Sequence, residues 1–299
     1  MMSSDKNRAS NPDDIGDQTL LPDRIRTLNC RGRMLELGGR TLIMGILNVT
    51  PDSFSDGGKY TTVEAAVRQA VKLAEDGADI LDIGGESTRP GADKVELQEE
   101  LHRIIPVIEA IRSEIDIPLS VDTYKPEVAR QALEAGAHIL NDIWGFKFDP
   151  QMAAIAASYE DVPVILMHNR PATRYTDFIS DVISDLEESV RIAQGAGISD
   201  QRIILDPGIG FAKTQEHNLR LMSKLHELRA IGYPLLLGTS RKSFIRSTLD
   251  LPADDVVEGT AATVAIGIAQ GCEIMRVHDV RQMKRVALMC DAIVRFQPS

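Results

Sequence analysis

The stretch PLSVDTYKPEVARQALEAGAHILND, residues 118–142, contains one complete repeat of the pattern that decides the fold. It opens on a short apolar run, Pro118–Asp122, continues through a helical pattern over Pro126–Ala135, and returns to a second apolar run, His138–Asp142. Gly136 stands between the helical pattern and the second run, where a glycine C-cap lets the chain leave a helix. The stretch therefore predicts a strand, a helix and a second strand of one parallel sheet.

The same alternation continues in both directions along the chain. Short runs rich in Ile, Leu and Val, apolar throughout instead of alternating, suit strands that are buried on both faces. With the two above, the eight runs include Thr41–Leu47, Asp79–Gly84, Pro163–Met167, Arg202–Asp206, Pro234–Gly238 and Glu273–Val277. The remaining helical patterns cover Val63–Asp76, Leu97–Glu114, Ile179–Ala193, Gln215–Ile231, Thr260–Gly271 and Val280–Val294.

Eight such units in 299 residues favour a single α/β domain with a closed (β/α)₈ TIM barrel. An open, doubly wound sheet is the alternative, but no GxGxxG or GxxxxGK[ST] motif follows a strand. A short N-terminal β-hairpin is expected near residues 27–40, turned at Gly38 and Gly39. Residues 1–25 are rich in Ser, Asp, Asn and Pro, which predicts a flexible tail ahead of a barrel domain over 26–299.

Composition excludes several classes of partner. The formal net charge is −11, so the chain as a whole repels nucleic acid and anionic membranes, and an anionic substrate would need a local basic cluster. The three cysteines are widely spaced without a CxxC pair, which argues against a disulfide framework and a zinc site. We expect a cytoplasmic protein, because no signal peptide and no apolar stretch of about 20 residues is present.

In a barrel of this kind the active site is built at the C-terminal ends of the strands. Carboxylates and amides follow the middle runs, whereas cations follow the last two. The residues at these positions are Asn48, Asp122, Asn141, Asp142, His168, Asn169, Asp206, Lys242, Arg276 and His278. A pocket with two chemically different ends is therefore predicted.

Each end suits a different part of one ligand. Asp122, Asn141 and Asp206 could accept the paired N–H donors of a flat heterocycle. A phosphate group would instead be held by cations, for which the candidates are Lys242, Arg276, His278 and Arg89. The alternative for each residue alone stays open: an Asp or Asn after a strand is often only the N-cap of the next helix.

Seven motifs together resemble dihydropteroate synthases, in the order of that family. They are NVTPDSFSDGG (48–58), DIGGESTRPGA (82–92), SVDTYKPEVA (120–129), LNDIWG (140–145), LDPGIGFAKTQEHN (205–218), GTSRKSF (238–244) and RVHDV (276–280). The resemblance implies a TIM-barrel transferase of folate biosynthesis. It would condense 6-hydroxymethyl-7,8-dihydropterin pyrophosphate with p-aminobenzoate, need Mg²⁺, form a homodimer and be a sulfonamide target. Ala212 and Arg246 depart from the family pattern, where glycine is common.

The resemblance also implies roles for individual residues. The pterin would be bound by Asp122, Asn141, Ile143, Met167, Asp206 and Lys242. The pyrophosphate would be bound by Asn48, Arg276 and His278, with Asn48 also reaching Mg²⁺. The p-aminobenzoate would be bound by Phe54, Thr88, Arg89, Pro90 and Ser243. Asp56, Lys242 and Arg89 would be catalytic.

Two related functions are alternatives. A pterin-binding methyltransferase would keep the Asp and Asn rim without the SFSD and STRPG stretches. A non-catalytic pterin-binding paralogue would lose one of those stretches or the run Ser240–Ser243. All three are present in this chain, which favours the synthase.

Overall fold

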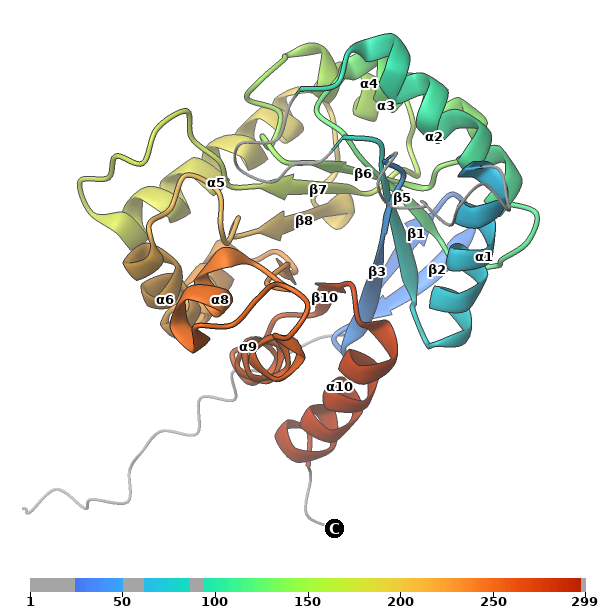
Figure 1. Ribbon diagram of the computed structural model, residues 1–299. Coiled ribbons are helices and arrows are strands. Elements are labelled where there is room, and N and C mark those ends of the chain that lie inside the picture. Colours follow the sequence, from blue (N-terminus) through green and yellow to red (C-terminus); the bar gives the residue numbers. More distant parts are fainter. Residues whose placement is uncertain (1–24, 51–61, 87–93, 297–299) are drawn as a thin grey trace, which may run out of the picture.

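The computed structural model of the protein describes residues 25–50, 62–86 and 94–296. Eight parallel strands stand in the centre with helices around them (Figure 1). In sheet order they are β8 (Ile203–Asp206), β7 (Val164–Met167), β6 (Ile139–Asp142), β5 (Leu119–Asp122), β4 (Ile80–Gly84), β3 (Leu42–Asn48), β10 (Ile274–Val277) and β9 (Leu236–Leu237). A parallel bridge between Leu205 and Leu235 joins the two ends of this order, so the predicted barrel is confirmed.

Helices connect successive strands and form the outer layer. The α-helices are α1 (Thr62–Glu75), α2 (Leu97–Ile111), α3 (Pro126–Ala135), α4 (Gln151–Ala157), α5 (Phe178–Gly195), α6 (Gln215–Ser223), α7 (Leu225–Leu228), α8 (Ser243–Leu249), α9 (Val257–Ala269) and α10 (Val280–Val294). Short 3₁₀ turns are η2 (Asp200–Arg202) and η3 (Arg229–Ile231). None of the helices in the described part of the chain is long and apolar enough to cross a membrane.

Most predicted helices are present, and α3 and α10 have the predicted bounds. Gly136 ends α3 with φ +118°, a conformation that a glycine adopts without a steric penalty. The single helix predicted over Gln215–Ile231 is wrong, because Lys224 leaves the helical conformation at φ −126° and ψ 17° and separates α6 from α7. The short helices α4 and α8 were not predicted.

An antiparallel hairpin precedes the barrel, formed by β1 (Arg26–Cys30) and β2 (Arg33–Leu37). The predicted hairpin is confirmed, but its turn at Gly38 and Gly39 is wrong. The turn lies at Arg31 and Gly32, which both have positive φ, as a two-residue hairpin loop requires. The Asn29 side chain accepts a hydrogen bond from the Gly32 N–H at 2.8 Å and fixes this turn.

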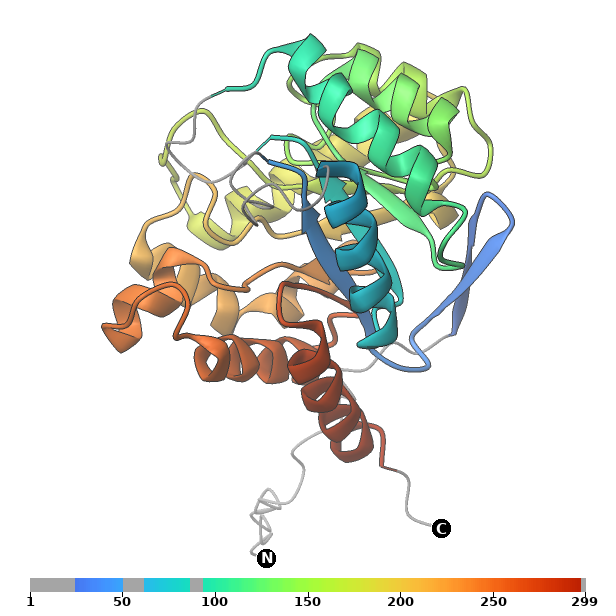
Figure 2. The same ribbon diagram turned by 45° about the vertical axis from the view of Figure 1, so that its right-hand side comes forward.

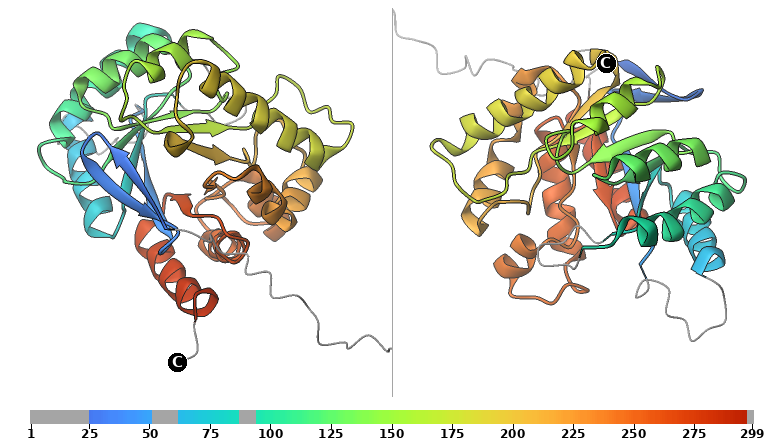
Figure 3. Two further views of the ribbon diagram at one scale, coloured as in Figure 1. Left: turned by 180° about the vertical axis from the view of Figure 1, so that it is seen from behind. Right: turned by 90° about the horizontal axis from the view of Figure 1, so that it is seen from above.

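The hairpin belongs to the N-terminal end of the barrel and lies at one edge of the molecule (Figures 2 and 3). The Arg31 side chain donates to the carbonyl of Ala137, just ahead of β6, at 2.8 Å. The same end holds the last helix, because Asp291 of α10 accepts hydrogen bonds from the backbone and hydroxyl of Thr41, both at 2.8 Å. Arg295 likewise donates to the Gly38 carbonyl at 2.5 Å.

Two apolar layers form the core. The larger one lies between the strands and the surrounding helices. The smaller one fills the barrel itself, where the inner side chains of the hairpin pack against the first inward residues of the strands. Its members are Leu28, Cys30, Leu35, Leu37, Leu42, Met44, Ile80, Ile139, Ile165, Ile204, Leu236 and Ile274. This apolar layer, the barrel floor, fills the N-terminal half of the barrel.

Candidate active site

A polar layer lies directly above the barrel floor. Side chains alternate between the two faces of a strand, so the residue two positions beyond each floor residue also points into the barrel. On four strands this step leads from isoleucine to a polar or charged residue. The pairs are Ile80 and Asp82, Ile139 and Asn141, Ile204 and Asp206, and Ile274 and Arg276. The C-terminal half of the barrel therefore encloses charges on an apolar base.

Arg276 joins two carboxylates in this layer. Its Nε donates to Asp82 Oδ2 at 2.6 Å, and its Nη2 donates to Asp122 Oδ2 at 2.7 Å. The Asn141 amide donates to the same Oδ2 of Asp82 at 3.2 Å. Asp82 and Asp122 are both buried, so these contacts are little screened by water. Burial raises the pKa of Asp122 to about 7, against the opposing effect of Arg276.

Three buried oxygens of this layer have no hydrogen-bond partner among the residues that the structure describes. They are Asp82 Oδ1, Ser120 Oγ and Asp122 Oδ1, on the neighbouring strands β4 and β5. Buried polar atoms are nearly always paired in native proteins, and leaving one unpaired costs about 1–3 kcal/mol. These atoms can therefore receive donors from a ligand or from water.

Asp206 and Lys242 form the opposite side of the pocket. Asp206 Oδ1 accepts the Gly208 N–H at 2.7 Å, so this carboxylate also fixes the turn that follows β8. Lys242 donates to the Ile209 carbonyl, and its Nζ lies 4.9 Å from the centre of the Phe211 ring. Burial lowers the pKa of Lys242 to about 8, while the charge of Asp206 opposes this shift. The ammonium is thus poised to gain an anionic partner.

A cavity of about 300 Å³ opens beside these groups, and most of its lining comes from residues that follow β9 and from the end of β10. It is lined by four cationic side chains, Arg241, Lys242, Arg246 and Arg276, in a protein of net charge −11. The predicted local basic cluster is therefore present. The cavity wall also includes Asn48, Phe211, Gly238, Ser243 and His278.

Two residue pairs fix the side of the cavity that is formed by residues following β9 and β10. His278 Nδ1 lies 3.0 Å from the Ser240 hydroxyl, which also accepts the His278 backbone N–H at 3.2 Å. Arg241 is held by Asp279, with Nη2 to Oδ1 at 2.6 Å. The Lys242 and Arg276 side chains both approach Gly238, where an added Cβ would lie 3.8 Å from each. Both cations therefore lie close to the backbone at the end of β9.

An apolar cluster forms the remaining wall. Ile143 and Met167, the two apolar contacts predicted from the sequence, pack with Tyr124 in one buried group. Trp144 and Phe211 pack against that group. Aromatic and aliphatic side chains beside paired carboxylates and amides are the usual lining of a pocket for a flat heterocycle. Tyr124 and Phe211 were not predicted, although both stand in the recognised motifs.

Other polar residues at strand ends have structural roles. Asp142 accepts the backbone N–H groups of Trp144 and Phe146 at 2.8 and 2.9 Å, so it caps the turn that follows β6 and is not the N-cap of α4, whose N-cap residue is Pro150. His168 is fully buried, with Nε2 3.0 Å from Asp185 Oδ2 and Nδ1 2.7 Å from Lys213 Nζ. Burial lowers the pKa of His168 to about 4, so its ring is neutral at physiological pH and accepts from Lys213.

The sequence-predicted residues divide into four groups, of which the first, Ile143 and Met167, lies in the apolar cluster described above. Asn48, Lys242, Ser243, Arg276 and His278 line one cavity, and Asp122, Asn141 and Asp206 stand at the same end of the barrel. Phe54, Asp56, Thr88, Arg89 and Pro90 lie outside the described residues. Asp82 was missed, although a charge within the otherwise apolar stretch ILDIG (80–84) was a signal. Within the described ranges, no three His, Cys, Asp or Glu side chains cluster as metal ligands.

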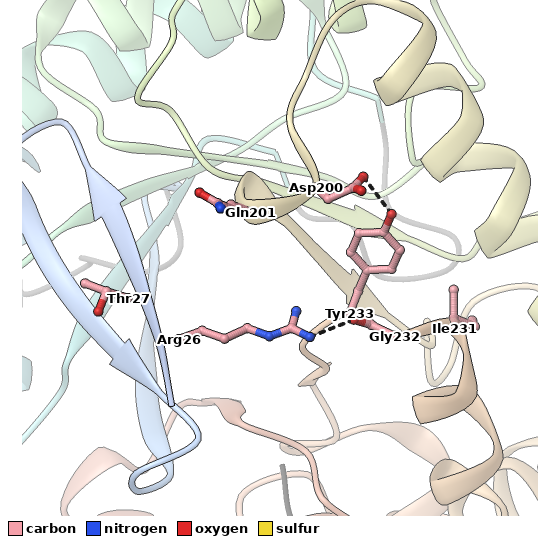
Figure 4. Close-up of a pocket in the computed structure, with 7 residues that line it drawn as sticks. All are labelled: Arg26, Thr27, Asp200, Gln201, Ile231, Gly232 and Tyr233. Carbon is pink, nitrogen blue, oxygen red and sulfur yellow. Dashed lines mark hydrogen bonds between the residues drawn. The ribbon is translucent and has the colours of Figure 1, made fainter. Parts of the chain in front are cut away.

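A second, larger cavity of about 560 Å³ lies at the opposite end of the barrel (Figure 4). It is lined by Arg26 and Thr27 of the hairpin, by η2 and by residues 231–233. Its main polar groups already pair with one another, since Arg26 Nη2 donates to the Gly232 carbonyl at 3.0 Å and Tyr233 donates to Asp200 at 2.8 Å. The cavity at the C-terminal strand ends is therefore the candidate active site despite its smaller volume.

Comparison with known proteins gives one consistent result. The family described as "Pterin binding enzyme" matches residues 44–278. A dihydropteroate synthase of Bacillus subtilis is 55% identical over 272 residues, which cover 91% of this chain and 95% of that protein.

Solved structures show the same similarity. A Xanthomonas albilineans dihydropteroate synthase with 4-aminobenzoic acid has a TM-score of 0.88 and 43% identity, covering 92% of this chain and 100% of that one. The Xanthomonas albilineans dihydropteroate synthase in complex with 7,8-dihydropteroate has a TM-score of 0.84 and 42% identity, covering 91% and 100%.

Proposed function

We propose roles for the residues of this site in the reaction of a dihydropteroate synthase. The premise is that the chain belongs to the pterin-binding enzyme family and is a dihydropteroate synthase. It is a transferase that condenses 6-hydroxymethyl-7,8-dihydropterin pyrophosphate with p-aminobenzoate to give 7,8-dihydropteroate and pyrophosphate. The observation that carries the assignment of residues is the pairing of a carboxylate and amide layer with a cluster of cations in one pocket.

The pterin ring binds at the carboxylate side of the pocket. Asp122 presents an unpaired Oδ1 and Asp206 stands on the facing side, so the two carboxylates accept N–H groups from opposite edges of the ring. Asn141 can both donate and accept, which suits the mixed edge of a pterin. Ile143 and Met167 cover one face of the ring.

The pyrophosphate binds at the cationic side, against Arg276, His278 and Asn48, with Lys242 between the two sides. Arg276 suits this position because Asp82 and Asp122 fix its guanidinium while part of it still lines the cavity. A guanidinium held in this way can donate to phosphate oxygens without losing further side-chain freedom.

The donor set fits a magnesium ion that arrives with the substrate. Mg²⁺ commonly takes only one or two protein oxygens and completes its shell with phosphate and water. Asn48 offers such an oxygen in the cavity wall, at the end of β3. When bound there, Mg²⁺ supplies further neutralisation of charge on the leaving pyrophosphate.

The p-aminobenzoate binds beside Ser243 and Phe211 at the mouth of the pocket. Phe54, Thr88, Arg89 and Pro90 complete this part on the strength of their motifs. Sulfonamides, which share the aniline group of p-aminobenzoate, compete at the same place.

Chemistry then needs positioning and charge stabilisation. Arg276, His278 and Lys242 neutralise the charge that develops as the C–O bond to pyrophosphate breaks. Asp56 stabilises the positive charge left on the exocyclic carbon of the pterin, and Arg89 orients the benzoate. The neutral aromatic amine attacks that carbon and then loses a proton, so no covalent enzyme intermediate forms.

A homodimer is supported by an exposed apolar surface on the last two helices. On α9, Ile266 is 48% exposed, and on α10 Leu288, Met289 and Ile293 are 58%, 62% and 62% exposed. The two helices lie side by side (Figure 1). Large exposed apolar patches commonly mark protein interfaces, so we assign the dimer contact to this surface.

Three free cysteines support a cytoplasmic, reducing location.

One assay tests the function directly. The purified protein is mixed with the pterin pyrophosphate, Mg²⁺ and p-aminobenzoate, and 7,8-dihydropteroate is sought by mass spectrometry. Product is expected only when all three are present. Transfer of a methyl group to or from a methylpterin in place of condensation would favour the methyltransferase alternative, and binding without turnover would favour the paralogue.

A further inference from the structure

The ammonium group of Lys125 contacts residues on both sides of the segment 87–93. Lys125 lies three positions after the last residue of β5, Asp122, and is the N-cap residue of α3. Its Nζ donates to Glu86 Oε2, to Glu100 Oε2 and to the Val95 carbonyl, each at 2.5 Å. Glu86 and Val95 flank the segment 87–93, which contains Thr88, Arg89 and Pro90.

Further contacts hold the same two flanking residues. Tyr124 donates its hydroxyl hydrogen to Glu86 Oε1 at 3.1 Å, and the Val95 N–H donates to Glu86 Oε2 at 3.3 Å. Next to Glu86, the Gly85 carbonyl accepts from Arg103 of α2 at 2.9 Å. Gly85 packs so closely on α2 that an added Cβ would lie 2.7 Å from Cγ2 of Ile104. The base of the segment is thus fixed from β5 and from α2.

The cluster of Glu86, Glu100 and Lys125 is buried and carries more negative than positive charge. The exposed fractions of these side chains are 10%, 1% and 17%. Burial raises the pKa of Glu100, and the hydrogen bond and charge of Lys125 oppose that shift. Without the ammonium, two carboxylates would face each other in a poorly hydrated space, so Glu86 and Glu100 would separate or take up a proton.

We propose that Lys125 is a positioning residue for the second substrate, because it holds Glu86 and Val95 together on either side of the motif positions assigned to p-aminobenzoate, Thr88, Arg89 and Pro90. The proposal rests on the assignment of those three residues to p-aminobenzoate above. Lys125 itself does not line the cavity. Its removal should therefore affect the benzoate much more than the pterin.

Two variants and one matched control test this. Lys125→Met removes the ammonium, and Glu86→Gln weakens the same contact from the segment side without altering the exit of β5. The control is Lys284→Met at the other end of β4, where Lys284 Nζ contacts Asp79 Oδ2 at 3.1 Å with a similar side-chain exposure of 22%. All three proteins are compared by thermal melting, by the KM for p-aminobenzoate at saturating pterin pyrophosphate and Mg²⁺, and by titration with a pterin that lacks pyrophosphate.

Lys125→Met should raise the KM for p-aminobenzoate by about tenfold to a hundredfold, the scale expected for a small misplacement of binding groups. Glu86→Gln should act in the same direction, and neither should change the affinity for the pterin. Lys284→Met should leave both quantities unchanged. A wild-type KM in folded Lys125→Met and Glu86→Gln proteins, or an equal loss for pterin and benzoate, overturns the proposal. If Lys125→Met does not fold, Glu86→Gln decides.

A second readout does not depend on turnover. Hydrogen exchange at the amides of Gly85, Glu86 and Val95 should be faster in Lys125→Met than in wild type and unchanged in Lys284→Met. Unchanged exchange would refute the proposal even if the wild-type protein made no dihydropteroate, an outcome that would refute only the proposed function.

Discussion

Arg276 on β10 donates from Nε to Oδ2 of Asp82 on β4 at 2.6 Å, joining two residues 194 positions apart in the chain. The same Oδ2 accepts from Asn141. One buried carboxylate therefore connects a residue assigned to the pterin with a residue assigned to the pyrophosphate. Asp82→Asn should weaken both ligands by about 1–3 kcal/mol, because a buried guanidinium loses half of its ionic support. Separate titrations with pyrophosphate and with a pterin measure this, and unchanged affinity for both would reduce Asp82 to a packing residue.

Asp206→Ala should weaken pterin binding by about 1–3 kcal/mol, because two ligand N–H donors lose their acceptor. Asp142→Ala is the matched control, since Asp142 caps the turn to Trp144 and Phe146. That variant should lose thermal stability and keep its pterin affinity when folded. Calorimetric titration with a pterin analogue distinguishes the two carboxylates, and equal affinities in the two variants would reduce Asp206 to its role as the cap of the turn after β8.

His278→Ala should weaken pyrophosphate by about 1.5–3 kcal/mol, the scale of one hydrogen bond to a charged group, and spare a pterin without pyrophosphate. Arg276→Ala should differ. Its removal leaves Asp82 and Asp122 buried without their shared cation, so Asp122 takes up a proton and pterin binding also weakens. The two variants are compared by titration with each ligand at neutral pH. Identical ligand profiles would contradict this distinction.

Binding should depend on pH in opposite directions for the two ends of the ligand. N–H donors favour the ionised form of Asp122, so pterin affinity should fall as the pH drops below about 7. A phosphate group favours the ammonium form of Lys242, so affinity for the pyrophosphate-bearing pterin should also fall as the pH rises above about 8. Each limb should approach about a tenfold change per pH unit for one proton. A pterin without pyrophosphate should lose affinity on the acid limb alone, and an alkaline limb with that ligand would show that this limb does not arise from contact between Lys242 and the pyrophosphate.

Charge on the α9–α10 surface should separate the proposed dimer. Leu288→Glu combined with Ile293→Glu places two carboxylates on side chains that are 58% and 62% exposed in the single chain. The folded variant should behave as a monomer in light scattering, while wild type behaves as a dimer. A wild-type monomer, or a variant that stays dimeric, would contradict the assignment of this surface.

The sequence alone predicted the barrel because each β-α unit carries its own local signals. Gly136, for example, marks the end of α3 without reference to any distant residue. Asn141, Asp206 and Arg276 could be selected because they stand at or near strand ends, where a barrel builds its site. Their positions in the pocket follow from topology alone.

Features that depend on contacts between distant segments were missed. Asp82 lies inside an apolar run, and only the packing of Ile80 into the barrel floor shows that Asp82 faces the pocket. The hairpin turn was placed at Gly38 because a pair of glycines is the stronger local signal, whereas Arg31 adopts its positive φ within a hairpin that Ala137 helps to anchor. The three contacts of Lys125 come from separate segments and have no local signature at all.

The barrel floor also determines how this enzyme can be handled. Arg26 begins the hairpin on that floor, and Arg295 after α10 bonds to Gly38 on the same side, so both ends of the described chain point away from the pocket. An attachment point beside Ile25 or Phe296, the ends of the described residues, would therefore lie on the side away from the pocket. Enzyme immobilised through the hairpin or the end of α10 should keep its access to ligands in inhibitor screening.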